Sequence, residues 1–151
     1  MLKNIDPLLS PDLLKVLAEM GHGDEIAVVD ANFTGRRLAH GRPLLRLDGV
    51  GLARACAAVL SVLPLDEAVP LPVAFMRVSD TPQGQVSEVQ QEVFQVLLAS
   101  NVAATKVRAV ERFAFYELIG DSFAILQTGE LRPFGNFMFK KGVITASSGA
   151  Q

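Results

Sequence analysis

The sequence predicts an α/β protein, a layered α/β/α single domain with a largely parallel central sheet, over residues 1–151. Segments whose apolar residues recur on one helical face alternate along the chain with short apolar runs of the kind that form buried strands. This alternation is typical of a parallel sheet covered by helices. A chain of 151 residues, 50% hydrophobic and 20% charged, also has the size and composition of one folded domain.

The first helix and strand have clear local signals. Ser10 can cap a helix, Pro11 fits the first helical turn, and an apolar face then continues until Gly21. The apolar run over residues 26–29 predicts a buried strand. Residues 30–42 are rich in Asn, Thr, Gly, Arg and His, so we expect a long loop, and loops of that length are often functional.

The later elements continue the alternation, with glycine and proline at several of their boundaries. In chain order we expect a strand over residues 44–47, a helix from Asp48-Gly49 to Pro64, a strand over 71–78, a polar turn over 79–85, a helix over 86–97, a strand over 106–110, a helix over 111–120, and strands over 123–127 and 134–139. The tail from Ser147 onward is small and polar, and we expect it to be frayed.

Charge and hydropathy narrow the classes of partner. The net charge of −2 gives no electrostatic basis for binding nucleic acid or an anionic membrane, and no apolar run is long enough to span a membrane. The mean hydropathy of +0.32 is high for a small monomer, so we expect a homo-oligomer. Cys56 is the single cysteine and the N-terminus has no secretory signal pattern, which together favour a cytoplasmic protein.

The motif content argues against several kinds of chemistry. Neither His22, His40 nor Cys56 takes part in a metal-ligand spacing, so we expect no metal. No P-loop or G-x-G-x-x-G motif follows an expected strand, and no G-x-S-x-G elbow is present. The remaining possibility is acid–base chemistry that uses no cofactor.

Gly21-His22-Gly23 is the segment best suited to acid–base chemistry. Histidine can gain and lose a proton near neutral pH, and the flanking glycines let a ligand approach its ring. The alternative is structural, because Gly21 can end the first helix and His22 can then interact with the last helical carbonyls. The residues alone leave both interpretations open.

Seven segments, spread in order over nearly the whole chain, resemble the D-ribose pyranase / L-fucose mutarotase family. They are Leu9-Ser10-Pro11-Asp12-Leu13-Leu14, Met20-Gly21-His22-Gly23-Asp24-Glu25-Ile26, Asp30-Ala31-Asn32-Phe33, Arg112-Phe113-Ala114-Phe115-Tyr116-Glu117, Thr128-Gly129-Glu130, Gly135-Asn136 and Lys140-Lys141-Gly142-Val143. The Phe-Tyr-Glu segment is similar to the fucose branch of that family.

The resemblance implies an isomerase without metal or cofactor, an L-fucose mutarotase-like enzyme that interconverts the α and β anomers of a free monosaccharide. It implies His22 as the proton donor and Tyr116 as the second catalytic group. The implied substrate-binding residues are Asp30, Arg112, Phe134, Gly135 and Asn136. The family forms ring-like decamers, which the resemblance extends to this chain. Two alternatives stay open, a ribose pyranase-type pyranose/furanose interconversion and a sugar-binding or transport-associated module without catalysis.

Arg112 and Tyr116 are four residues apart, a spacing that places them on one face of either a helix or a strand. Their structural alternatives are a solvated charge and a half-buried core aromatic. The family's Tyr-Gly-Asn loop is Phe134-Gly135-Asn136 here, so one hydroxyl is missing, and Thr34 stands where the family often has proline. These departures bear on which sugar is bound.

His22 precedes the first expected strand and Asp30 follows it. At ~3.3 Å per residue, a mostly extended path would separate the two by more than ~20 Å. A monosaccharide spans far less, and residues 26–29 are too apolar to form a loop that folds back. We therefore expect a composite site at a subunit boundary, with His22 from one chain and Asp30 from its neighbour.

Overall fold

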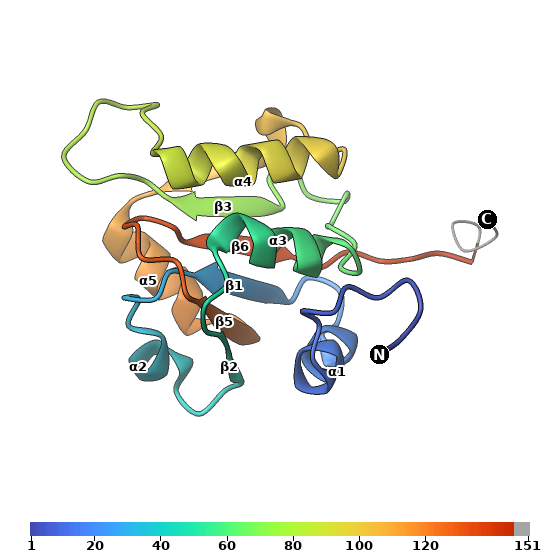
Figure 1. Cartoon of the computed structure of the whole chain (residues 1–151). Helices are drawn as coiled ribbons and strands as arrows, with labels where there is room; N and C mark the ends of the chain where they lie inside the picture. Colours follow the sequence, from blue (N-terminus) through green and yellow to red (C-terminus); the bar gives the residue numbers. More distant parts are fainter. Residues whose placement is uncertain (147–151) are drawn as a thin grey trace.

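A computed structural model describes residues 1–146 and shows a six-stranded sheet with helices on both faces (Figure 1). The strands, in the spatial order β2-β5-β1-β6-β3-β4, are β1 (Glu25–Val29), β2 (Leu44–Leu47), β3 (Val73–Met76), β4 (Val107–Val110), β5 (Ala124–Thr128) and β6 (Phe137–Lys140). Every pairing is parallel except those of β6, which runs antiparallel to β1 and β3. The predicted α/β layers and the largely parallel sheet are confirmed.

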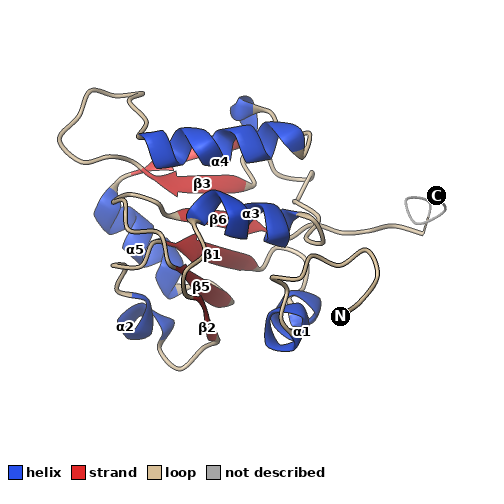
Figure 2. Ribbon diagram, in the orientation of Figure 1, coloured by secondary structure: helices blue, strands red, loops and turns tan. Residues whose placement is uncertain are grey.

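Two layers of helix cover the two faces of the sheet (Figure 2). Helices α1 (Pro11–Glu19), α3 (Leu52–Leu60) and α4 (Glu88–Ala99) pack on one face, and α2 (Gly35–Ala39) and α5 (Arg112–Gly120) pack on the other. A short 3₁₀ turn, η1 (Ala104–Lys106), precedes β4. None of the helices in residues 1–146 is both long and apolar enough to cross a membrane.

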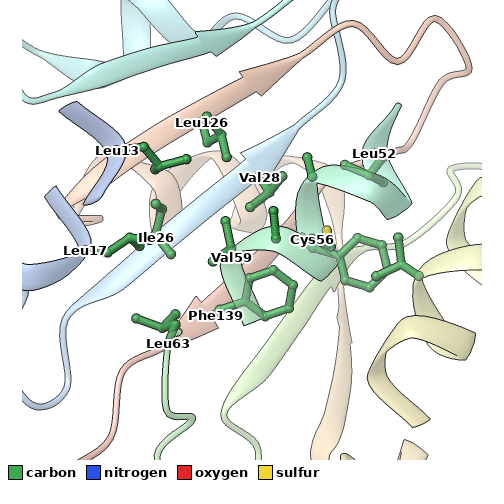
Figure 3. Packing of buried hydrophobic residues seen from close by; sticks show 14 of the residues in the cluster. Leu13, Leu17, Ile26, Val28, Leu52, Cys56, Val59, Leu63, Leu126 and Phe139 are labelled. Carbon is green, nitrogen blue, oxygen red and sulfur yellow. The ribbon is translucent and has the colours of Figure 1, made fainter. Parts of the chain in front are cut away.

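The larger core lies between α1, α3 and the middle of the sheet (Figure 3). Helix α1 starts where expected, because Ser10 Oγ accepts a hydrogen bond from Leu13 N at 3.2 Å and Pro11 occupies the first turn. Its buried face, which includes Leu13 and Leu17, meets Ile26 of β1 in the same core. This packing holds the start of β1 directly after the glycine segment.

Four of the expected boundaries are wrong. The expected loop over residues 30–42 contains α2, whose Ala39 is buried against the smaller core. Helix α3 ends at Leu60 instead of continuing to Pro64. The strand expected over residues 71–78 is limited to β3. The expected strand over 134–139 begins only at Phe137, because Phe134 has a left-handed φ of 62° that a strand cannot contain. The tail from Ser147 onward lies outside the described residues.

The topology defines two opposite edges of the sheet. Strands β1 to β5 end at one of them, which we call the carboxyl edge, and β6 begins there. The loop from β5 to β6, residues 129–136, must pass the end of β1, because β1 lies between those two strands. The other edge, which we call the amino edge, carries the α1–β1 connection. Figure 1 shows α1 at the right of the view, with α2 and α5 at the left.

Candidate active site

A paired carboxylate and amide form the centre of the carboxyl edge. Asp30 directly follows β1, and Asn136 directly precedes β6, which is the neighbouring strand. Asn136 Oδ1 accepts a hydrogen bond from Asp30 N, and Asn136 Nδ2 donates to Asp30 Oδ2, both at 3.1 Å. Both residues are at least 95% buried in the isolated chain. The two side chains therefore fix one another's orientation.

The surroundings of Asp30 raise the pKa of its carboxyl group. Burial is the main cause, and it outweighs the hydrogen bonds from Asn136 and from neighbouring backbone N–H groups, which lower the pKa. A buried carboxylate whose pKa is raised by burial is stabilised by further hydrogen-bond donors. The hydroxyl groups of a sugar are donors of this kind.

Arg112 and Tyr116 share one face of α5, as their spacing predicts. Arg112 Nε donates to the Tyr116 hydroxyl oxygen at 2.9 Å, and the guanidinium carbon lies 5.6 Å from the centre of the Tyr116 ring. Glu111 caps the helix by accepting hydrogen bonds from the N–H groups of Phe113 and Ala114. The guanidinium and phenol are thus presented together at the start of α5.

Tyr116 is linked to the Asp30 turn through an aromatic contact. The ring of Phe33, three residues after Asp30, lies edge-on to the Tyr116 ring at a centroid distance of 5.6 Å. Phe134 and Tyr116 are both half-buried against the smaller core. The structure therefore brings six of the seven residues inferred from the sequence to one edge: Asp30, Arg112, Tyr116, Phe134, Gly135 and Asn136.

The Phe134-Gly135-Asn136 loop is held in place by a buried glutamine of α4 and by close packing against α3. Gln90 of α4, which is fully buried, donates from Nε2 to Phe134 O at 2.9 Å and to Met76 O at 2.8 Å. A Cβ on Gly135 would lie 3.2 Å from Leu52 Cδ2, so a side chain there would crowd the start of α3. Neither Gln90 nor this packing has a recognisable signal in the sequence, because both depend on contacts across the fold.

An ion-pair network anchors the same loop at its other end. Arg132 donates to both oxygens of Glu130 and to both oxygens of Glu92, at 2.7–2.9 Å. Hydrogen bonds from the Arg132 side chain outweigh the effect of burial and lower the pKa of Glu130 to about 2. Glu130 Oε2 also accepts from Leu52 N at 3.4 Å, which ties the loop to the first turn of α3.

This network predicts acid sensitivity. A carboxylate with a lowered pKa stabilises the fold fully above its unfolded pKa, and this contribution is lost as the pH falls through the folded value. We expect the melting temperature of the wild type to fall more steeply than that of Glu130→Gln between about pH 5 and pH 3, with the variant less stable at pH 7. Thermal melts over this range measure the difference, with the exposed Glu19→Gln as control. Parallel curves for wild type and Glu130→Gln would contradict the assignment.

His22 lies at the amino edge, away from the other six residues. Its Nε2 is 3.1 Å from Asp66 Oδ1, and its side chain is 51% exposed. A carboxylate only accepts hydrogen bonds, so Nε2 carries the hydrogen and Nδ1 remains for a ligand. Together with Asp66, His22 lines a hollow of about 340 Å³.

Asp66 is a candidate functional residue that the sequence did not reveal. It is 96% buried, and burial acts to raise its pKa. Hydrogen bonds from Ala68 N and His22, with the charges of His22 and Lys140, outweigh this and keep the pKa below its usual value. Asp66 is 44 residues from His22 along the chain, so no local spacing links them.

The helix-capping alternative for His22 is wrong. The carbonyls at the end of α1 are satisfied by Lys141, whose Nζ donates to Leu17 O and to Met20 O at 2.6 Å. His22 instead bonds to Asp66. Lys141 also fixes the glycine segment, because its carbonyl oxygen accepts from Gly23 N at 2.8 Å. The ring of His22 therefore lines the hollow with Asp66 and does not cap α1.

The chain is similar to known proteins over nearly its whole length. The model of the RbsD / FucU transport protein family matches residues 3–144. The L-fucose mutarotase of Glaesserella parasuis is 41% identical over 143 residues, which are 95% of this chain and 96% of that protein. The fucose mutarotase of Homo sapiens is 40% identical over 146 residues, which are 95% and 94% of the two chains.

Solved structures share the fold. The fucose mutarotase of Streptococcus pneumoniae in complex with L-fucose is 35% identical and superposes with a TM-score of 0.87, covering 95% of this chain and 100% of that one. RbsD of Bacillus subtilis complexed with D-ribose is 21% identical, with a TM-score of 0.73 over 96% of this chain and 100% of that one, and it shows the fold alone.

Proposed function

The chain belongs to the RbsD / FucU transport protein family, and on that premise we propose that it is an isomerase, a mutarotase that interconverts the α and β anomers of L-fucose or a similar free monosaccharide. The observation that carries the proposal is the similarity to proteins named L-fucose mutarotase, which extends over nearly the full length of both chains. The carboxyl edge adds chemical support, since it offers a carboxylate, an amide, a guanidinium and a phenol to a polyhydroxylated ligand.

The reaction needs only proton transfer. One group gives a proton to the ring oxygen while another takes the proton of the anomeric hydroxyl, so the bond between the anomeric carbon and the ring oxygen breaks and an open aldehyde forms. Rotation of the aldehyde and the reverse steps then give the other anomer. We assign the first role to His22, which acts as an imidazolium with Nδ1–H toward the ring oxygen and Nε2–H on Asp66. We assign the second role to Tyr116, which acts as a phenolate whose oxygen accepts a hydrogen bond from Arg112. After ring opening His22 is neutral and Tyr116 is a phenol, and ring closure by the reverse steps restores both forms.

The remaining residues of the carboxyl edge fit substrate binding. Asp30 would accept bonds from sugar hydroxyls, Asn136 offers a donor and an acceptor, and Arg112 donates from a guanidinium that already positions Tyr116. Asp66 would orient His22 by holding its Nε2 hydrogen, so that Nδ1 faces the sugar.

The two edges can meet at one sugar only if they come from different subunits. The five residues of β1 separate His22 from Asp30, and they span about 16 Å in an extended strand. A monosaccharide cannot bridge that distance through the core of the sheet. The proposed site therefore combines the carboxyl edge of one subunit with His22 of the partner subunit.

Exposed apolar side chains flank both edges and support this composite site. Phe113 and Leu131, next to Arg112 and Glu130, are 67% and 76% exposed in the isolated chain. At the amino edge Val143 lines the same hollow as His22 and is 60% exposed. Burial of such groups between subunits stabilises an oligomer. We propose that the assembly is a ring-like homo-oligomer, a decamer as in the family, and that it works in the cytoplasm.

Nuclear magnetic resonance tests the function directly. Exchange spectroscopy on L-fucose should show cross-peaks between the α and β anomers that grow with protein concentration. D-Ribose tests the pyranose/furanose reaction in the same way, and saturation transfer reports binding. Binding of sugars without any protein-dependent exchange would overturn the enzymatic proposal in favour of a binding module.

The Phe134 position predicts an effect on affinity. Phe134 precedes Asn136 by two residues and is half-buried against the smaller core. Phe134→Tyr adds a hydroxyl to the loop that carries Asn136, and L-fucose should bind about fivefold more tightly if this hydroxyl reaches the sugar. Titration of both proteins gives the two dissociation constants, and Phe94→Tyr on α4 is the control for an added hydroxyl elsewhere. Weaker binding of L-fucose by Phe134→Tyr would indicate a pocket shaped for a less polar sugar face.

A further inference from the structure

Gln127 is a buried amide in β5 that none of the proposed catalytic steps uses. It is 95% buried, and its strand lies between β1 and β2. Its Nε2 lies within hydrogen-bond distance of three backbone carbonyl oxygens, those of Phe33 at 2.8 Å, Ala31 at 3.1 Å and Asp30 at 3.4 Å. One side chain thus gathers three of the four carbonyls of the turn from Asp30 to Phe33.

A buried amide at a strand position is costly unless it is hydrogen-bonded, and an apolar residue would fill the same space without that cost. Here the hydrogen bonds go to a single segment, the turn that carries Asp30. The turn has other internal ties, since Asp30 Oδ1 accepts from Asn32 N at 3.1 Å and Asp30 O from Phe33 N at 3.3 Å. Gln127 ties this turn to β5, in addition to the bonds of Asp30 with Asn136 and of Ala31 N with Glu130 O.

Gly35 provides the space that Gln127 occupies. A Cβ on Gly35 would lie 2.9 Å from Gln127 Oε1 and 2.8 Å from Leu44 Cδ1, closer than side chains tolerate. Gly35 is the first residue of α2 and has no left-handed φ that would itself call for glycine. Close packing against both Leu44 and the Gln127 amide therefore explains the glycine, and the three residues pack together beside the turn.

From this geometry we propose that Gln127 is a positioning residue, which sets the direction of the Asp30 carboxylate and, through Phe33, the place of the Tyr116 ring. The inference rests on the proposed function for the roles of Asp30 and Tyr116. The link to Tyr116 is the edge-on contact of its ring with Phe33, whose carbonyl is the nearest acceptor of the Gln127 amide. Gln127 does not need to touch the sugar to act in this way.

The primary test is Gln127→Met, which keeps an unbranched side chain of similar size and removes the donor. We expect the Kd for L-fucose to rise roughly tenfold. The variant loses the hydrogen bonds from Gln127 Nε2 that hold the turn carrying Asp30, and Asp30 is a proposed sugar-binding group. The maximal rate should fall less than the affinity, because Gln127 bonds directly to the turn that carries Asp30 but reaches Tyr116 only through Phe33, and His22 lies at the other edge. Val59→Ala, a core truncation in α3, is the control for a general loss of stability.

Thr34→Pro provides a rescue that a merely structural role would not give. Thr34 has φ −77°, which proline adopts, and its N–H donates no hydrogen bond within residues 1–146. In the double variant Gln127→Met/Thr34→Pro, the proline restricts the backbone of the turn that the Gln127 amide no longer holds. Part of the lost affinity for L-fucose should therefore return. If Gln127→Met lowers the melting temperature but leaves the Kd at the wild-type value, the proposal is overturned.

Hydrogen exchange separates this proposal from the proposed function. The amides of Ala31 to Phe33 should exchange faster in Gln127→Met than in the wild type, whichever sugar the protein binds and whether or not it catalyses exchange. If Gln127→Met does not fold, Gly35→Ala provides a second variant, because its Cβ crowds the Gln127 amide, together with Leu44, without removing the donor. This variant should also raise the Kd and speed the hydrogen exchange of the turn. Unchanged hydrogen exchange and unchanged affinity in the folded variant would contradict the positioning role.

Discussion

Replacement of His22 by glutamine is expected to remove most of the anomer exchange while leaving the fold intact. Glutamine can still donate a hydrogen bond to Asp66, but it cannot give a proton to the ring oxygen at neutral pH. Loss of one general acid corresponds to a rate decrease of ~10²–10⁴-fold. The side chain is half-exposed and has one hydrogen-bond partner among residues 1–146, so the free energy of unfolding should change little.

The second histidine of the chain offers a matched control. His40 is exposed at the end of α2, whereas His22 bonds to Asp66 at the amino edge. His40→Gln should exchange L-fucose anomers at the wild-type rate, as measured by the same magnetic resonance experiment. A His22→Gln protein that exchanges anomers at the wild-type rate on every sugar it binds would show that His22 is not the proton donor.

Mixed oligomers should regain activity that neither parent has. In His22→Gln subunits the carboxyl edge is intact, and in Asp30→Asn subunits the amino edge is intact. If each site takes one edge from each of two subunits, random mixing at equal amounts leaves about one quarter of the boundaries with both residues. Co-expression with two different affinity tags, followed by two purification steps, yields verified mixed oligomers for the exchange measurement.

A pair of substitutions at one edge controls for mixing itself. Asp30→Asn and Asn136→Ala both damage the carboxyl edge, because these side chains bond to each other. Their mixed oligomers should be no more active than the two parents. Recovery in this pair, or its absence in verified oligomers of the His22 and Asp30 variants, would contradict a site shared between subunits.

The sequence predicted the layers because those signals are local, whereas most of the edge residues were implied by the resemblance to a known family. The apolar spacing and the Ser10-Pro11 cap predicted α1, and the apolar run predicted β1, as found. The spacing of Arg112 and Tyr116 is sufficient to place them together, because residues four apart share one face of either a helix or a strand. Such features depend on neighbours a few residues apart, which a single sequence displays.

The missed features depend on contacts between distant segments. Helix α2 has only five residues and is stabilised by packing on the smaller core instead of by its own turns. Asp66 and Gln127 have partners 44 and 94 residues away. An aspartate after Leu65 or a glutamine at the end of a strand is ordinary in isolation, so its role emerges only when the sheet brings the partner close.

The structure of the oligomer with bound L-fucose tests the composite site most directly. One sugar should contact Asp30 and Asn136 of one subunit and His22 of the partner subunit, with the His22 ring within hydrogen-bond distance of the ring oxygen. The exposed Phe113, Leu131 and Val143 should be buried at the same boundary. A sugar held by His22 and Asp30 of one chain, or bound at the carboxyl edge with no histidine near its ring oxygen, would contradict the account.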